Sequence, residues 1–172
     1  MKRGDRVEDF ALPDQTGTER RFGDLLADGP VVLFFYPAAM TPGCTKEACH
    51  FRDLASEFAA VGARRVGIST DSVDKQSKFA DQQSFDYPLL SYADGKVATR
   101  FGVKRGLLGK LMPVKRTTFV IDTDGTVTSE VAVAVAACEG AGASEVFSTD
   151  DPAEGEMFVQ ARRLHFTAIE AR

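Results

Sequence analysis

The sequence is poor in cysteine and lacks a long apolar segment, and each shortage excludes a class of protein. Three cysteines occur among 172 residues, an odd number in a chain large enough to fold without disulfide bonds. The longest apolar run, residues 131–138, is too short to cross a bilayer. The first residues, MKRGD, lead into charged sequence and not into the apolar core of a signal peptide. We therefore expect a cytoplasmic protein without a membrane segment, whose cysteines are catalytic, metal-binding or merely buried.

A strong charge of one sign is also missing. The formal net charge is −4 at pH 7, which does not favour binding to nucleic acid or to an anionic membrane surface. Hydrophobic residues make up 44% of the sequence and charged residues 27%, ordinary values for a domain that buries a core. The length suits one globular domain, or one domain with a tail.

What the sequence does contain is an alternation of strand-like and helical segments. Continuous apolar runs that are typical of buried strands lie at 31–36, 65–70 and 117–122. Helical patterns lie at 73–83 and 96–101, and shorter strand-like segments at 10–17 and 87–90. Asp124 and Gly125 predict a hairpin turn before a further strand-like stretch, 126–136. This alternation predicts an α/β fold whose sheet is partly parallel.

Cys44 stands where the sequence predicts the first turn of a helix. Pro37 ends the apolar run 31–36, Thr41 is a candidate helix cap, and Pro42 suits the first turn of a helix whose pattern continues to Phe58. Unpaired backbone N–H groups and the positive end of the helix dipole favour an anionic sulfur at this place. The carboxyl end of a buried strand is also where open α/β sheets form their sites.

Ionisation of this thiol explains only part of a catalytic rate. With a pKa of about 8.5, roughly 3% of a free thiol is ionised at pH 7. Full ionisation therefore gains about thirtyfold, or about 2 kcal/mol, whereas enzymes commonly supply about 8 kcal/mol or more. The Thr41 hydroxyl, a fixed cation and local backbone N–H groups could stabilise the charge that moves onto a departing oxygen.

The residues around Cys44 form a long motif. Pro37-x-x-x-Thr41-x-x-Cys44 resembles the peroxidatic motif of peroxiredoxins. The longer string FFYPxxxTPGCTxExCxFRD, residues 34–53, is similar to the Q-type subfamily, also called bacterioferritin comigratory proteins. The similarity extends from about residue 10 to about residue 127, close to three quarters of the chain.

This resemblance implies a thioredoxin-like fold, with a central mixed β-sheet flanked by helices, and the reduction of hydrogen peroxide and organic hydroperoxides. It implies that Cys44 is the peroxidatic thiolate, which peroxide oxidises to sulfenic acid. Thr41 would hydrogen-bond the sulfur and the peroxide, Pro37 would shield the pocket from water, and Arg116 would be the active-site cation, since a guanidinium is always charged. No metal or organic cofactor is implied.

Cys49 matches the resolving cysteine of this subfamily, which would form a disulfide with Cys44 for an external dithiol, thioredoxin, to reduce. In an intact α-helix, Cα atoms five residues apart are separated by about 8.6 Å, whereas a disulfide rarely tolerates more than about 7 Å. The first turns of the helix, residues 43–50, are therefore predicted to unwind on oxidation. This scheme needs one chain, so we expect a monomer, with a dimer as the alternative.

Several residues keep a second interpretation. A one-cysteine mechanism would leave Cys49 as an ordinary buried thiol, and Cys138 is expected to be one. A zinc site made from Cys44, Cys49 and His50 would have an unusual spacing. Arg116 could simply pair with a carboxylate. Glu47 could be an ordinary charge on the helix face, or could hydrogen-bond within the active site.

Two other functions compete with the peroxidase. A thiol–disulfide oxidoreductase or redox sensor could use the same cysteine pair, although the usual signature has two residues between the cysteines and this chain has four. A holdase or binding module on the same fold would not need Cys44 at all.

The sequence predicts a division of the chain into two parts. Residues 1–137 form the predicted thioredoxin-like peroxiredoxin domain. Residues 138–172 do not resemble the closing segment of that family and are predicted to be an atypical C-terminal segment, a linker with a possible helix.

Overall fold

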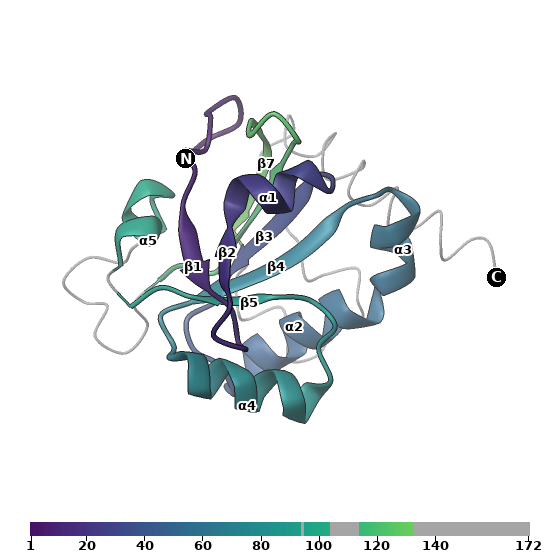
Figure 1. Ribbon diagram of the computed structural model, residues 1–172, viewed down its shortest axis with the longest axis vertical. Helices are drawn as coiled ribbons and strands as arrows, with labels where there is room; N and C mark the ends of the chain where they lie inside the picture. The colour runs from purple at the N-terminus through teal and green to yellow at the C-terminus, as the bar shows by residue number, and fades with distance from the viewer. Residues whose placement is uncertain (94, 104–113, 133–172) are drawn as a thin grey trace.

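The computed structural model describes residues 1–93, 95–103 and 114–132, and Figure 1 shows them as a sheet with helices on both faces. The central sheet has five strands in the order β5-β4-β3-β6-β7. Its strands are β3 (Val31–Phe35), β4 (Arg64–Ser69), β5 (Leu89–Ser91), β6 (Thr117–Ile121) and β7 (Val127–Ala132). A separate antiparallel pair is formed by β1 (Ala11–Pro13) and β2 (Glu19–Arg21).

The central sheet is mixed. Strand β3 pairs in parallel with β4, and β4 in parallel with β5, whereas β6 runs antiparallel to β3 and β7 antiparallel to β6. The helices are α1 (Phe22–Ala27), α2 (Pro42–Asp53), α3 (Ala55–Ala60), α4 (Val73–Gln83) and α5 (Lys96–Arg100). The mixed sheet with flanking helices confirms the predicted fold class at this level.

Strand β3 separates two apolar cores. All of its residues are buried, and successive side chains point to opposite faces of the sheet. Leu33 and Phe35 belong to a cluster that includes residues of α1 and α5, whereas Val32 and Phe34 belong to a cluster that includes residues of α2 and α4. Helices α2 and α4 therefore share one face of the sheet, as Figure 1 shows. Cys44 lies in this second cluster.

The long helices and strands lie where the sequence predicts them. The differences between prediction and structure concern short elements. The three apolar runs are β3, β4 and β6, and the helix predicted at 73–83 is α4. The helix predicted to reach Phe58 is instead two helices, because the backbone at Leu54 leaves helical geometry with φ −91° and ψ 21°. Strand β2 and helix α1 were not predicted, because β2 has three exposed residues and α1 is only six residues long.

Part of the prediction lies outside the described residues. Strand β7 lies within the stretch predicted at 126–136, of which residues 133–136 are not described. The boundary at residue 137, the segment 138–172 and Cys138 also lie outside, so the division into two parts stays a prediction. In the part of the chain that is described, no helix has the length and apolar character needed to span a membrane.

Candidate active site

Cys44 lies in the first turn of α2. The helix begins at Pro42, and Thr41 occupies the cap position with an extended backbone, φ −83° and ψ 147°. The predicted helix start is therefore confirmed. The Cys44 side chain is buried, with 1% of its surface exposed. Backbone N–H groups in the first turn of a helix lack partners within it and favour negative charge, so this placement favours the thiolate.

Arg116 brings a fixed cation to the sulfur. Its Nη2 donates to Cys44 Sγ at 3.2 Å, and its Nη1 donates to the Gly43 carbonyl at 3.3 Å. The two partners are 72 residues apart in sequence and meet because β3 and β6 are antiparallel. Phe35, at the end of β3, pairs with Thr117, at the start of β6, so the residue before β6 lies next to the start of α2.

Glu47 takes part in the same buried cluster. It lies one turn after Cys44 in α2, and its carboxylate accepts a hydrogen bond from Arg116 Nη1 while both side chains are 4% exposed. Of the two interpretations of Glu47, the geometry supports the one within the active site. Burial raises the pKa of the Glu47 carboxyl to about 7, and the charge and hydrogen bond of Arg116 oppose that shift. Burial lowers the pKa of Arg116, but the charges of Glu47 and Cys44 outweigh it, so the guanidinium stays charged.

We expect the contribution of Glu47 to the free energy of unfolding to fall as the pH rises between about 4.5 and about 7, and we expect Glu47→Gln to remove this contribution from the pH dependence. The folded-state pKa of Glu47 is raised from 4.5 to about 7, so this carboxyl binds more protons in the folded state than in the unfolded chain in this window. The stabilising protonation is complete at the acid end and is lost as the pH rises through the folded pKa. Urea unfolding at several pH values would measure the slope.

The matched control is Glu8→Gln, because the Glu8 side chain is 79% exposed and lies away from the site. This variant should keep the wild-type slope. A slope that is identical in Glu47→Gln and wild type would contradict the prediction and show that the pKa of Glu47 is the same in the folded and unfolded states.

Thr41 and Pro37 belong to the loop that precedes α2. Pro37 is buried and is the second residue after β3, and Thr41 is exposed. The Thr41 hydroxyl donates to the Ala38 carbonyl at 3.0 Å, so its proton is used within the loop. The contact of Thr41 with the sulfur and the peroxide, and the shielding of the pocket from water by Pro37, stay predictions.

Met40, which lies between these two residues, has a φ of 64°, a left-handed conformation that is uncommon for a residue with a side chain.

Asp71 fixes this loop, and no sequence motif predicted its role. Its Oδ2 accepts from the Ala39 amide at 2.6 Å and from the Ser69 hydroxyl at 2.8 Å, and its Oδ1 accepts from Lys75. Asp71 follows β4, the parallel neighbour of β3, so both strands deliver these residues to the same edge of the sheet. A carboxylate just after the second apolar run was the signal that could have identified it.

Cys49 lies in the same helix as Cys44 and faces α4. Its thiol is partly buried and donates to Gln83 Oε1 at 3.3 Å. Both cysteines are free thiols in an unbroken α2, where residues five apart are about 8.6 Å apart at Cα. Within the described residues, no three or more His, Cys, Asp or Glu side chains gather as they would around a metal ion.

The fold and the site define a class of protein, and comparison with known proteins identifies the family. A buried cysteine at a helix start, with a guanidinium on its sulfur, is the arrangement of an enzyme that works through a thiolate. The sequence model of the AhpC/TSA family matches residues 3–130. The chain belongs to this family, that of the peroxiredoxins, and membership implies a peroxidase that works through a thiol.

The relatives agree with this assignment. A Mycobacterium tuberculosis protein whose name places it among the peroxiredoxins is 80% identical over 124 residues, 72% of this chain and 80% of that protein. Peroxiredoxin Bcp of Escherichia coli is 40% identical over 130 residues, 74% of this chain and 83% of that protein. The crystal structure of peroxidoxin BcpB from M. tuberculosis matches with 76% identity and a TM-score of 0.74, covering 77% of this chain and 86% of that one. The predicted thioredoxin-like fold and the resemblance to Q-type peroxiredoxins are confirmed.

Proposed function

We propose that this protein reduces hydrogen peroxide and organic hydroperoxides through a Cys44 sulfenic acid and a Cys44–Cys49 disulfide, and that thioredoxin or a similar dithiol restores the thiols. The observation that carries the proposal is the contact of 3.2 Å between the Arg116 guanidinium and the buried sulfur of Cys44. Function as a monomer in the cytoplasm, without a cofactor, remains part of the proposal.

The first step is an attack of the Cys44 thiolate on an oxygen of the peroxide. An S–O bond forms, the O–O bond breaks, and the second oxygen leaves as hydroxide or alkoxide and takes up a proton to become water or alcohol. Negative charge moves from the sulfur to the leaving oxygen. The donors of Arg116 and the N–H groups of the first helical turn are fixed in place and can stabilise that charge as it moves.

The second step requires α2 to change shape. A separation of about 8.6 Å in an intact helix exceeds the limit of about 7 Å for a disulfide, so the first turns must unwind before Cys49 can reach the Cys44 sulfenic acid. An S–S bond then forms, the S–O bond breaks, and the oxygen leaves as water with the proton of the Cys49 thiol. The dithiol reductant supplies the two electrons that return both thiols.

We expect one equivalent of hydrogen peroxide to link Cys44 and Cys49 within one chain, and Cys49→Ser to stop the reaction at the sulfenic acid. Peptide mass spectrometry without reduction would detect the linked pair by its loss of two hydrogen atoms. A coupled assay with thioredoxin and its reductase would show whether the linked form turns over.

Cys138→Ser is the matched control, because it removes the remaining thiol of the chain outside the proposed pair. This variant should form the same link at the wild-type rate. A Cys44 sulfenic acid that stays unlinked in the wild-type protein would keep the peroxidase function and remove the resolving role of Cys49. Oxidation confined to Cys49 or Cys138 would contradict the proposal as a whole.

A further inference from the structure

Helix α2 is held at its two ends by different partners. Its first turns are held by Arg116, which donates to the Gly43 carbonyl, to Cys44 Sγ and to the Glu47 carboxylate. Its last turns are held from β4 and from the segment before β5, through Arg65 and Tyr87. The two sets share no residue, so one set can fail while the other stays in place.

The first set depends on the charge of Cys44. A hydrogen bond between a guanidinium and a thiolate is strengthened by charge on both partners. Conversion of the thiolate to sulfenic acid removes the negative charge, so Arg116 loses part of its attraction to this turn. The hydrogen bonds from Arg116 to Gly43 and Glu47 remain, but together they stabilise the first turn less than all three contacts did.

The second set begins with the Tyr87 hydroxyl, which donates to the Ala48 carbonyl at 2.7 Å and is buried. Arg65 Nη1 donates to the carbonyl of Phe51 at 2.8 Å and to that of Arg52 at 3.3 Å. The last carbonyls of a helix lack partners within it and carry negative partial charge, so a guanidinium suits this position. Neither contact involves a group that peroxide chemistry alters.

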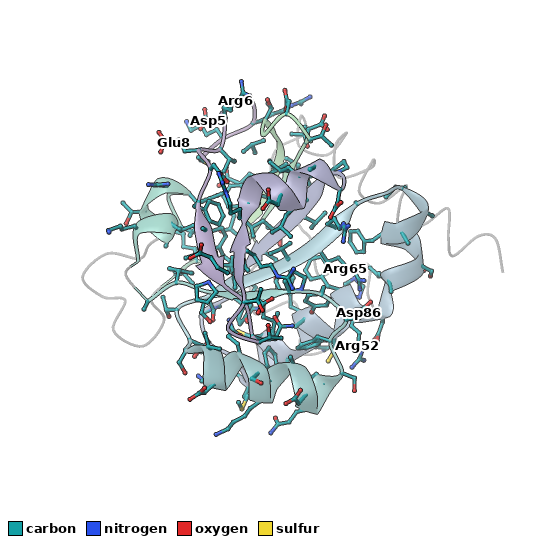
Figure 2. All side chains as sticks on the ribbon, in the orientation of Figure 1. Asp5, Arg6, Glu8, Arg52, Arg65 and Asp86 are labelled. Atoms are coloured by element: carbon teal, nitrogen blue, oxygen red, sulfur yellow. The ribbon has the colours of Figure 1, made fainter. Side chains whose placement is uncertain are left out.

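Arg65 is itself fixed in position. Its two terminal nitrogens bind the two carboxylate oxygens of Asp86 at 3.1 Å and 2.8 Å, and its guanidinium lies 5.2 Å from the centre of the Tyr87 ring. The Arg65 side chain is 11% exposed. Figure 2 shows Arg65, Asp86 and Arg52 together on the side of the molecule where α2 ends.

We propose that Arg65 and Tyr87 are positioning residues that keep the last turn of α2 folded, so that oxidation unwinds only the first turns and Cys44 moves to a stationary Cys49. This inference rests on the proposed peroxidase function. It assigns the two cysteines different mechanical roles: one is carried by the segment that unwinds, and the other stays on the segment that does not.

The surroundings of Cys49 support its stationary role. Its thiol donates to Gln83 Oε1 at 3.3 Å, and Arg52 Nη1, one turn later on α2, donates to the Gln83 carbonyl at 2.6 Å. The end of α4 is thereby attached to the last turn of α2, with Cys49 between them.

In the redox step, the S–O bond of the Cys44 sulfenic acid breaks, an S–S bond to Cys49 forms, and water leaves with the Cys49 proton.

Residue-resolved hydrogen exchange before and after one equivalent of hydrogen peroxide tests the inference. In an α-helix each amide bonds to the carbonyl four residues earlier. Amides 45–51 should therefore lose protection on oxidation, because their acceptors, carbonyls 41–47, lie in the unwound turns. The unwound segment then ends before Cys49 and is shorter than the range 43–50 that the sequence predicts. Amides 52–54 should keep it, because they bond to carbonyls 48–50, including that of Leu54 to His50 at 3.2 Å.

Two variants remove the contacts of the last turn. Tyr87→Phe deletes one hydroxyl, and Arg65→Met deletes the guanidinium. Each should extend the loss of protection to amides 52–54 and slow disulfide formation about three- to tenfold, the effect of one or two hydrogen bonds. Trapping of the sulfenic acid should show that its rate of formation changes less than about twofold, a split that a general loss of stability would not produce.

Matched controls are Tyr92→Phe and Arg64→Met. The Tyr92 hydroxyl is buried with no hydrogen-bond partner among the described residues, and Arg64 is half exposed and pairs with Asp28 on the surface. Both should behave as wild type. Equal loss of protection at 45–51 and 52–54 in oxidised wild type would overturn the inference while the disulfide still forms. Absence of both the sulfenic acid and the disulfide would overturn the proposed function along with it.

Discussion

Replacing Cys44 with serine will lower peroxide turnover by at least about a thousandfold, because a serine hydroxyl at this position is not ionised near neutral pH and cannot replace the thiolate as nucleophile. The fold should survive, since the smaller oxygen occupies the same buried place and can still accept from Arg116. Consumption of hydrogen peroxide in the presence of excess dithiol is the measurement.

Cys49→Ser is the control that separates the two cysteines. It should keep the first, single turnover at the wild-type rate and lose only the disulfide. Peroxide consumption that survives in Cys44→Ser would contradict the assignment of the nucleophile and would point to one of the other two thiols of the chain, Cys49 or Cys138.

Arg116→Met will lower the rate of sulfenic acid formation by about a hundredfold to a thousandfold, the loss that follows when one fixed donor to a developing charge is removed. The substitution also removes the charge and hydrogen bond that oppose the raised pKa of Glu47, so the buried carboxyl should be protonated and lack its partner, which costs about 1–3 kcal/mol. Stopped-flow measurement of the first oxidation and urea unfolding would give the two quantities separately.

A double variant separates chemistry from stability at this site. Arg116→Met combined with Glu47→Gln removes the ionisable carboxyl, so the free energy of unfolding should no longer depend on its protonation, while the rate of sulfenic acid formation stays low. The matched control is Arg100→Met, since the Arg100 side chain is 44% exposed and pairs with Glu8 at 3.7 Å. Recovery of the wild-type rate in the double variant would show that Arg116 serves only to neutralise Glu47.

The sequence predicts the parts of this site that depend on local patterns. Residues 31–35 form the central strand because their apolar side chains serve two cores, and the pattern shows this directly. Pro42 suits the first position of a helix, so the place of Cys44 is also a local inference, although the Thr41 hydroxyl does not cap the helix and donates to the Ala38 carbonyl instead. These predictions need no knowledge of which strands are neighbours.

The remaining parts depend on contacts between distant segments. Arg116 reaches Cys44 through the antiparallel pairing of β3 with β6, and only the resemblance to a family indicated it beforehand. The burial of Glu47 follows from the same pairing, so its two interpretations could not be separated from the sequence. The contact of Asp71 with the Ala39 amide likewise joins segments that are distant in sequence. The break between α2 and α3 at Leu54 is also not evident from the apolar pattern, which continues through it.

The pairing of β3 with β6 has a consequence for the protein while it is being made. A ribosome synthesises the two cysteines long before residue 116, and domains fold as the chain emerges from its N-terminal end. A nascent chain that stops short of β6 therefore carries Cys44 without the guanidinium that rests on its sulfur in the complete fold. Arg116 can therefore act on the Cys44 sulfur only after residue 116 has left the ribosome and β6 has paired with β3.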